Sequence, residues 1–226
     1  MNKIAYFDFC ETLANFQTAD AFVDFVRKKS NKSSMRFLNF SLLVLLKLRF
    51  NLFLNKFFPN AGVIKKFKLM QLKGVSSDTL NEYAKEYYLT QIKPNLISKV
   101  LDELLDLQKK DYNIIVVSAG YAVYLKYFTQ EYSIKHLIAT ELAFSSDGKK
   151  CLGKMLGKDC IYTEKVKRIE AYFGNEDLDY SDSISYSDSP SDLPMMRLTE
   201  KAVVVSESMS QNWSKENNFQ EIIWSK

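Results

Sequence analysis

Short apolar runs that stop abruptly at polar residues recur along this chain, separated by segments whose apolar residues have helical spacing. The run over 4–7 is followed at once by Asp8, the run over 112–118 ends in Ser118, and the run over 183–187 is followed by Asp188. Such runs are typical of buried strands, and parallel strands bring the residues that follow them to one rim of the sheet. We therefore expect these three side chains near one another.

The remaining pattern alternates between helix and strand. It predicts helices over 18–29, 63–72, 76–89, 94–110, 123–128, 162–173 and 193–198. It predicts further strands over 136–141, 202–205 and 221–224, and a hairpin over 142–153 around Ser146, Asp147 and Gly148. Alternation of this kind indicates a doubly wound, mainly parallel α/β sheet of the Rossmann type.

The part between the first two strands carries no strand pattern. We therefore predict a discontinuous core over residues 1–14 and 93–226, and an all-helical cap domain inserted over residues 15–92. An insert that begins directly after the first strand lies over the rim that holds Asp8. This position suits a lid that covers a ligand site.

Charge divides the chain in the same way. No acidic residue occurs from residue 25 to 77, whereas 12 of the 31 Lys and Arg do, which leaves 19 basic and 27 acidic residues elsewhere. Within this basic stretch, 35–58 is rich in Leu and Phe, but its longest uncharged run, 37–46, is shorter than the roughly 20 residues of a membrane span. Two interpretations remain open: a buried helical hairpin of the cap, or an interfacial helix in peripheral contact with an anionic membrane. Basic residues interleaved with Leu and Phe argue against nucleic acid as a partner.

Composition narrows the setting further. Three cysteines, Cys10, Cys151 and Cys160, are an odd number without paired or zinc-site spacing, so a reducing compartment is expected. The N-terminus lacks the order of a signal peptide, which indicates the cytoplasm, with the inner face of the membrane as the alternative. His136, the one histidine, lies at a strand start and is interpreted as structural.

The polar residues at the strand ends form an ordered set with two later positions. Asp8, Ser118, Lys165 and the pair Asp188 and Asp192 occur in this order across most of the chain. The set resembles the four-motif signature of the haloacid dehalogenase superfamily, most closely its phosphoserine-phosphatase-like branch. The resemblance implies hydrolysis of a phosphomonoester through an aspartyl phosphate on Asp8. The substrate class would be a phosphosugar, a lipid phosphate or a small phosphorylated metabolite.

The resemblance also assigns the other site residues. Ser118, the backbone amides of Ala119 and Gly120 at a helix start, Thr12 and Lys165 would bind the phosphate. Mg²⁺ would be held by Asp8, the backbone carbonyl of Cys10 and Asp188, with Asp192 in support. Carboxylate oxygens suit octahedral Mg²⁺, and three converging carboxylates would repel one another without a cation.

Cys10 departs from this pattern, because phosphatases of the branch carry there a second aspartate that protonates the leaving group and activates water. A thiol with a pKa of about 8.5 is a poor acid for this task, and loss of a general acid costs roughly 10² to 10⁴ in rate. Adjacent Glu11 points elsewhere, since successive residues diverge. Three interpretations remain: a phosphatase that uses another group, a phosphotransferase or slow hydrolase, and a non-catalytic binder of a phosphorylated ligand. Dehalogenases of the superfamily also lack this aspartate but need no Mg²⁺, so the pair Asp188 and Asp192 favours phosphate chemistry.

Overall fold

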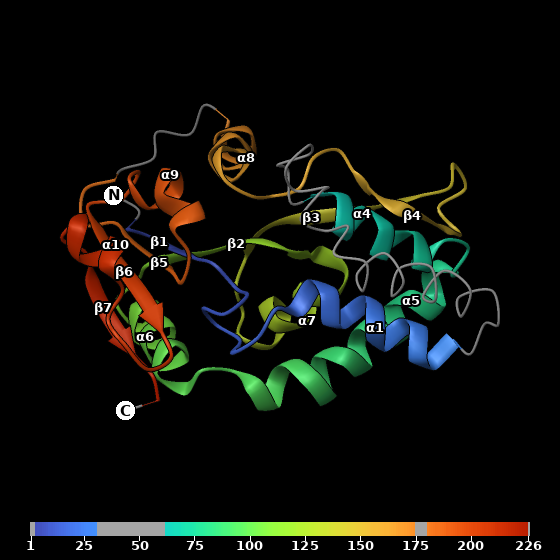
Figure 1. Cartoon of the computed structure of the whole chain (residues 1–226). Helices are drawn as coiled ribbons and strands as arrows, with labels where there is room; N and C mark the ends of the chain where they lie inside the picture. Colours follow the sequence, from blue (N-terminus) through green and yellow to red (C-terminus); the bar gives the residue numbers. More distant parts are fainter. Residues whose placement is uncertain (1–2, 31–61, 175–179, 226) are drawn as a thin grey trace.

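Seven strands of the described residues form a single sheet in the computed structural model, which describes residues 3–30, 62–174 and 180–225 (Figure 1). The strands are β1 (Ile4–Phe7), β2 (Asn113–Tyr121), β3 (His136–Phe144), β4 (Cys151–Leu156), β5 (Ile184–Ser187), β6 (Lys201–Ser206) and β7 (Gln220–Ile223). Their order is β4-β3-β2-β1-β5-β6-β7, and every pair is parallel except β3 with β4. The predicted mainly parallel fold is therefore confirmed. Since the sheet grows to one side of β1 and then to the other, its ligand crevice is expected beyond the carboxyl ends of β1, β2 and β5.

Helices cover both faces of this sheet. The described helical elements are α1 (Thr18–Ser30), α4 (Gly62–Leu69), η1 (Met70–Leu72), α5 (Ser77–Tyr87), the π-helix η2 (Tyr88–Ile92), η3 (Lys93–Asn95), α6 (Ser98–Lys109), α7 (Ala122–Glu131), α8 (Thr163–Phe173), η4 (Pro190–Asp192), α9 (Leu193–Met196) and α10 (Asn212–Glu216). Figure 1 shows α8 and α9 on one face and α6 and α7 on the other. The alternation along β1 serves both layers: Ala5 and Phe7 belong to one buried cluster, and Ile4 and Tyr6 to the other.

Two predicted elements have different boundaries, and one helix was not predicted. The helix predicted over 94–110 begins only at Ser98, because Leu96 pairs with Ala14 and the Ile97 amide donates to the Leu13 carbonyl at 2.8 Å, which keeps both residues extended. Strand β2 continues to Tyr121, three residues past its predicted end. The five-residue helix α10 was not predicted, since a single turn is too short to display a helical period.

The hairpin predicted over 142–153 is confirmed. Strands β3 and β4 are antiparallel, and the Gly148 amide donates to the Ser145 carbonyl at 2.8 Å in the turn between them. Gly148 has a φ of +70°, which a glycine adopts without the strain that a side chain would add.

The inserted segment is helical in its described part and hydrogen-bonds to this hairpin. The Gly74 amide donates to the Cys151 carbonyl, the Cys151 amide donates to the Val75 carbonyl, both at 2.8 Å, and the Ser77 amide donates to the Lys149 carbonyl at 2.9 Å. These bonds tie the insert to the edge of the sheet. The boundaries 15–92 and the role of a cap stay predictions.

No helix of the described residues is long and apolar enough to cross a membrane. The Leu- and Phe-rich stretch over 35–58 lies outside the described residues, so both of its interpretations stay open.

Candidate active site

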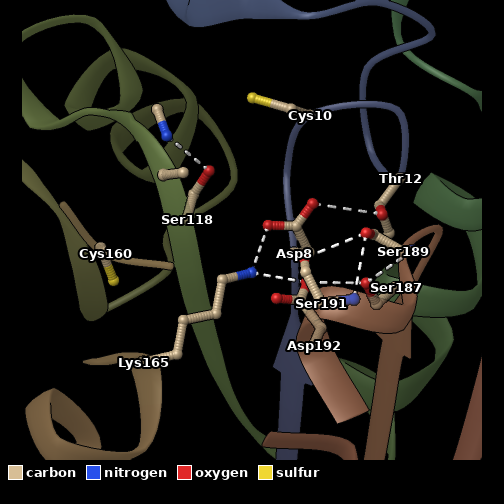
Figure 2. Close-up of polar contacts among 12 residues, drawn as sticks. Asp8, Cys10, Thr12, Ser118, Cys160, Lys165, Ser187, Ser189, Ser191 and Asp192 are labelled. Carbon is tan, nitrogen blue, oxygen red and sulfur yellow. Dashed lines mark hydrogen bonds and ion pairs between the residues drawn. The ribbon is translucent and has the colours of Figure 1, made fainter. Parts of the chain in front are cut away.

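A buried carboxylate at the end of β1 forms the centre of the site. Asp8 is 6% exposed, and its backbone amide donates to the Tyr186 carbonyl of β5 at 3.0 Å, which fixes the chain at the rim of the sheet. The Lys165 ammonium lies 2.6 Å from Asp8 Oδ1 and 2.7 Å from Asp192 Oδ2 (Figure 2). A single lysine thus links the carboxylates that follow β1 and β5.

The sequence of α8 explains why Lys165 is buried. Lys165, Ile169 and Phe173 recur every four residues and form the buried face of this helix. The lysine is 2% exposed, so its charge has almost no contact with water. Burial lowers the pKa of Lys165, but the charges of Asp8 and Asp192 outweigh this effect and raise it above its ordinary value. Lys165 is therefore a fixed cation.

The Ser- and Asp-rich stretch after β5 folds into a short turn that orients Asp192. The Ser189 hydroxyl accepts a hydrogen bond from the Ser191 amide at 3.2 Å and caps the 3₁₀ turn that starts at Pro190. The Ser187 hydroxyl donates to Asp192 Oδ2 at 2.7 Å (Figure 2). Asp192 accepts bonds from Lys165 and Ser187 and thereby holds Lys165 in position.

A fully buried threonine connects Asp8 with Asp188. Thr12 Oγ1 lies 3.3 Å from Asp8 Oδ2 and 3.0 Å from Asp188 Oδ1, and it accepts a hydrogen bond from the Asp188 amide at 3.0 Å. The hydroxyl has one proton to donate, so only one of the two carboxylates receives it at a time. The structure therefore places Thr12 between two acids, and its expected contact with the phosphate stays a prediction.

Both acids have raised pKa values. Burial raises the pKa of Asp8 to about 6, with the Lys165 charge opposing and the Asp192 charge adding to the shift. Burial and then the charge of Asp8 raise the pKa of Asp188 to about 7. Both carboxylates are therefore costly to ionise in the protein alone.

Two of the three acids at this rim suit a divalent cation. Within the described ranges, no three His, Cys, Asp or Glu side chains are gathered as a metal site, and Asp192 is engaged by Lys165. Asp8 and Asp188 do fit a hard cation: they offer carboxylate oxygens, they lie on either side of one hydroxyl, and their ionised forms lack a matching positive charge beyond Lys165. The roles of Cys10 and Asp192 at a metal stay predictions.

Cys10 lies beside this cluster, and its side chain points away from it (Figure 2). Its sulfur is 3.0 Å from Thr18 Oγ1, which is in turn 2.8 Å from the Tyr124 hydroxyl. Burial, and then the charge of Asp8, raise the pKa of the Cys10 thiol. The thiol is therefore protonated at neutral pH. Neighbouring Glu11 is exposed and accepts a hydrogen bond from the side chain of Gln17.

Ser118 lies on β2, next to β1 (Figure 2). It is fully buried, and its hydroxyl accepts a hydrogen bond from the Gly120 amide at 3.0 Å. Ala119 and Gly120 were expected at a helix start, but β2 continues through them with a shift of register, and α7 begins only at Ala122. The prediction of a helix start at Ala119 and Gly120 was wrong, because the strand continues past its polar residue.

Sequence reasoning missed a contact between the insert and this loop. Lys65 of α4 donates to the Ala119 carbonyl at 2.8 Å and pairs with Asp159 at 2.7 Å. Thr140 also donates to Asp159, at 2.7 Å. Lys65 is one of 12 basic residues in an acid-free stretch, and nothing in its local sequence distinguishes it.

The remaining candidates have structural surroundings. His136 opens β3, and its ring packs against Tyr172 and Phe173 at centroid distances of 5.7 and 5.4 Å. Cys151 and Cys160 are free, buried thiols.

Comparison with known proteins adds independent information. The model of the haloacid dehalogenase-like hydrolase family matches residues 5–197. A histidinol-phosphatase of Neisseria meningitidis serogroup C (strain 8013) is 26% identical over 143 residues, which are 62% of this chain and 64% of that protein. The chain therefore matches less than two thirds of this relative's length.

Two solved structures illustrate the likeness in fold. A protein of unknown function from Bordetella pertussis Tohama I has a TM-score of 0.80 and 20% identity, with 98% of each chain covered. A phospho-aspartyl intermediate analogue of phosphoserine phosphatase has a TM-score of 0.64 and 16% identity, with coverage of 100% of this chain and 94% of that one. At these identities the likeness concerns the fold alone.

Proposed function

Because the chain belongs to the haloacid dehalogenase-like hydrolases, we propose that it is a Mg²⁺-dependent phosphatase that cleaves a phosphomonoester through an aspartyl phosphate on Asp8. The observation that carries this proposal is the buried ion-pair cluster of Asp8, Lys165 and Asp192 at the carboxyl ends of β1 and β5. The histidinol-phosphatase match supports the same reaction class. A small phosphorylated substrate follows from it.

In the first step a carboxylate oxygen of Asp8 attacks phosphorus, the bond to the leaving oxygen breaks, and that oxygen takes up a proton. Water then attacks the aspartyl phosphate, which releases inorganic phosphate and restores the carboxylate. Lys165 contributes in both steps, because a fixed ammonium 2.6 Å from Asp8 offsets negative charge that develops on the phosphoryl oxygens. Asp192 and Ser187 hold that ammonium in place.

Asp8 and Asp188 would hold the Mg²⁺ ion, with the Cys10 carbonyl as a further ligand by resemblance. A bound divalent cation supplies positive charge that stabilises a transferring phosphoryl group. Thr12 lies between the two carboxylates, with its hydroxyl within hydrogen-bonding distance of both. Ser118, whose hydroxyl accepts a hydrogen bond from the Gly120 amide on the neighbouring strand β2, would bind a phosphate oxygen, as the resemblance implies.

A second candidate function is a catalytically impaired member or a phosphotransferase. The observation that favours it is Cys10 itself, whose buried thiol lies 3.0 Å from Thr18 Oγ1 and supplies no carboxylate to protonate a leaving group. Under this alternative the protein binds a phosphorylated ligand and turns it over slowly or transfers its phosphoryl group.

The test of the phosphatase proposal is release of inorganic phosphate from a panel that contains an aryl phosphate, phosphoserine, histidinol phosphate and alkyl phosphates. Each is assayed with Mg²⁺ and with EDTA. We expect turnover that needs Mg²⁺ and that disappears in Asp8→Asn. Asp102→Asn, which changes an exposed aspartate of α6, is the matched control and should retain full activity. Release that persists in Asp8→Asn would refute the proposed nucleophile.

Cys10→Asp separates the two candidates. A gain of roughly 10² or more in kcat would mean that the natural protein lacks its general acid, as the impaired candidate requires. An unchanged or lower rate in a folded variant would mean that another group already transfers the proton. Cys151→Asp, at a buried thiol outside the cluster, controls for the effect of a new buried carboxylate on folding.

A further inference from the structure

A cavity of about 1200 Å³ opens against the residues that flank the catalytic cluster. Cys10 and Ala119 line it, and each lies within two residues of Asp8 or Ser118. Its other walls come from the start of α1, from α4 and η1, from β4, and from the segment that leads into α8 together with the start of that helix. Pockets for small ligands are typically about 300–1000 Å³, so this one has room for more than a phosphate with a compact polar body.

The charges that line the cavity are unbalanced. Its three acids are each paired with a cation: Asp20 with Lys68, Asp159 with Lys65, and Glu164 with Arg168. Four more lysines line it and have no acidic partner within the part of the chain that the structure describes: Lys66, Lys154, Lys158 and Lys167. A cleft lined by unpaired cations attracts anions and raises their rate of encounter.

Apolar side chains form part of the wall of the same cavity. Seven large apolar residues of the described chain are exposed, and two of them line the cavity: Met70 at 50% and Tyr162 at 54%. The partly buried Ile64, Met155 and Ile161 line it as well. Single exposed apolar residues are ordinary, but a group of them beside a pocket indicates a surface that binds an apolar partner.

We infer that this cavity selects an amphiphilic phosphomonoester, whose phosphate reaches Asp8 while an extended apolar body lies against Met70 and Tyr162; the inference rests on the proposed phosphatase function. The lysines attract the phosphate, and the apolar wall binds the body. A compact polar substrate such as a phosphoamino acid would be attracted by the lysines but would leave the apolar wall exposed to water. Figure 1 shows α4, which leads directly into the η1 turn that carries Met70, beside β4.

The test is a series of soluble n-alkyl phosphates of increasing chain length, each below its aggregation concentration, with an aryl phosphate as a general substrate. Each methylene that enters an apolar wall contributes about 0.8 kcal/mol, so kcat/KM should rise by roughly two- to fourfold per methylene until the wall is covered. Met70→Ser combined with Tyr162→Ser should flatten this dependence of kcat/KM on chain length.

Matched controls lie elsewhere on the surface. Met209 and Tyr172 are 66% and 49% exposed, and neither lines the cavity. Met209→Ser combined with Tyr172→Ser makes the same chemical changes and should preserve the dependence on chain length. An equal loss in both double variants would overturn the inference, because it would show a general effect of surface polarity.

The outcomes separate the two proposals. Phosphate release from the aryl phosphate without any dependence on chain length overturns the amphiphile inference and leaves the phosphatase proposal intact. No Asp8-dependent release from any compound refutes the phosphatase proposal itself. A final arm with phosphatidic acid in phosphatidylcholine vesicles distinguishes the source: turnover there as well as in the soluble series supports a bilayer lipid, and turnover of the soluble series alone supports a free amphiphile.

Discussion

Replacing Asp188 by asparagine should stabilise the protein when no metal is bound. Burial of this carboxylate and the nearby charge of Asp8 together raise its pKa from 3.8 to about 7. A shift of roughly three pKa units corresponds to at most about 4 kcal/mol against the ionised form. Because the side chain keeps some contact with water, we expect about 1–3 kcal/mol. Asparagine retains an oxygen that can accept the Thr12 hydrogen bond, while the charge is removed and the second oxygen becomes an amide NH2 group.

The pH dependence gives this prediction its sign. An acid whose pKa is higher in the folded state binds more protons there, so the free energy of unfolding decreases as pH rises from the unfolded pKa to the folded one. For Asp188 this range runs from about 4 to about 7, and Asp8, with a pKa of about 6, acts in the same direction. Metal-free wild type should therefore lose stability across this range, and Asp188→Asn should lose less.

The assay is urea unfolding in EDTA at several pH values, repeated with saturating Mg²⁺. At pH 8 in EDTA the variant should have the higher free energy of unfolding in urea. A thermal melt under the same conditions should show a midpoint higher by about 2–4 °C for each kcal/mol gained. Added Mg²⁺ should stabilise wild type and have little effect on the variant, because the charge that binds the ion is gone. Asp102→Asn should behave like wild type throughout. A variant no more stable than wild type in EDTA at pH 8 would refute the electrostatic argument.

Three further changes test other contacts of the site. Lys165→Met leaves two buried carboxylates unpaired and should cost about 3–5 kcal/mol in urea unfolding, whereas the exposed Lys167→Met should cost less than about 0.5 kcal/mol. Gly120→Ala places a Cβ 2.7 Å from the Tyr124 hydroxyl and should cost about 1–3 kcal/mol, a loss that Tyr124→Phe in the same chain should partly restore in unfolding experiments. Lys158→Glu should lower kcat/KM several-fold at low salt and only slightly at high salt. The same charge reversal at Lys215 of α10, which does not line the cavity, should leave kcat/KM unchanged at both salt concentrations.

The sequence predicted those parts of the site that local pattern determines. Asp8 and Asp188 follow strands whose apolar runs are short and end abruptly, so their place at one rim follows from parallel pairing. Lys165 could be placed on a helix because its neighbours have helical spacing. That it lies on the buried face follows from Ile169 and Phe173, four and eight residues later.

The contacts that depend on packing could not be predicted in this way. The resemblance assigned Thr12 to phosphate, which stays a prediction, but it did not indicate that the loop places the Thr12 hydroxyl between two carboxylates. Lys65 reaches the Ala119 carbonyl only because α4 is folded back over the sheet. These contacts depend on a local turn of the backbone or on the packing of residues that are far apart in the chain. The spacing of apolar residues along the sequence does not predict either kind of contact.

The surroundings of Cys10 bear on the question of the missing acid. Its sulfur contacts Thr18, whose hydroxyl is hydrogen-bonded to that of Tyr124. The rings of Tyr121 and Phe22 are tilted against each other at a centroid distance of 6.3 Å. A carboxylate at this position would be buried among aromatic rings and hydroxyl groups and would lose its contact with water, so its pKa would rise. This pocket is therefore built for a neutral side chain. In Cys10→Asp the raised pKa would favour the protonated carboxyl, which suits a proton donor and opposes a base, so a gain in the first step of the reaction should exceed any gain in the second.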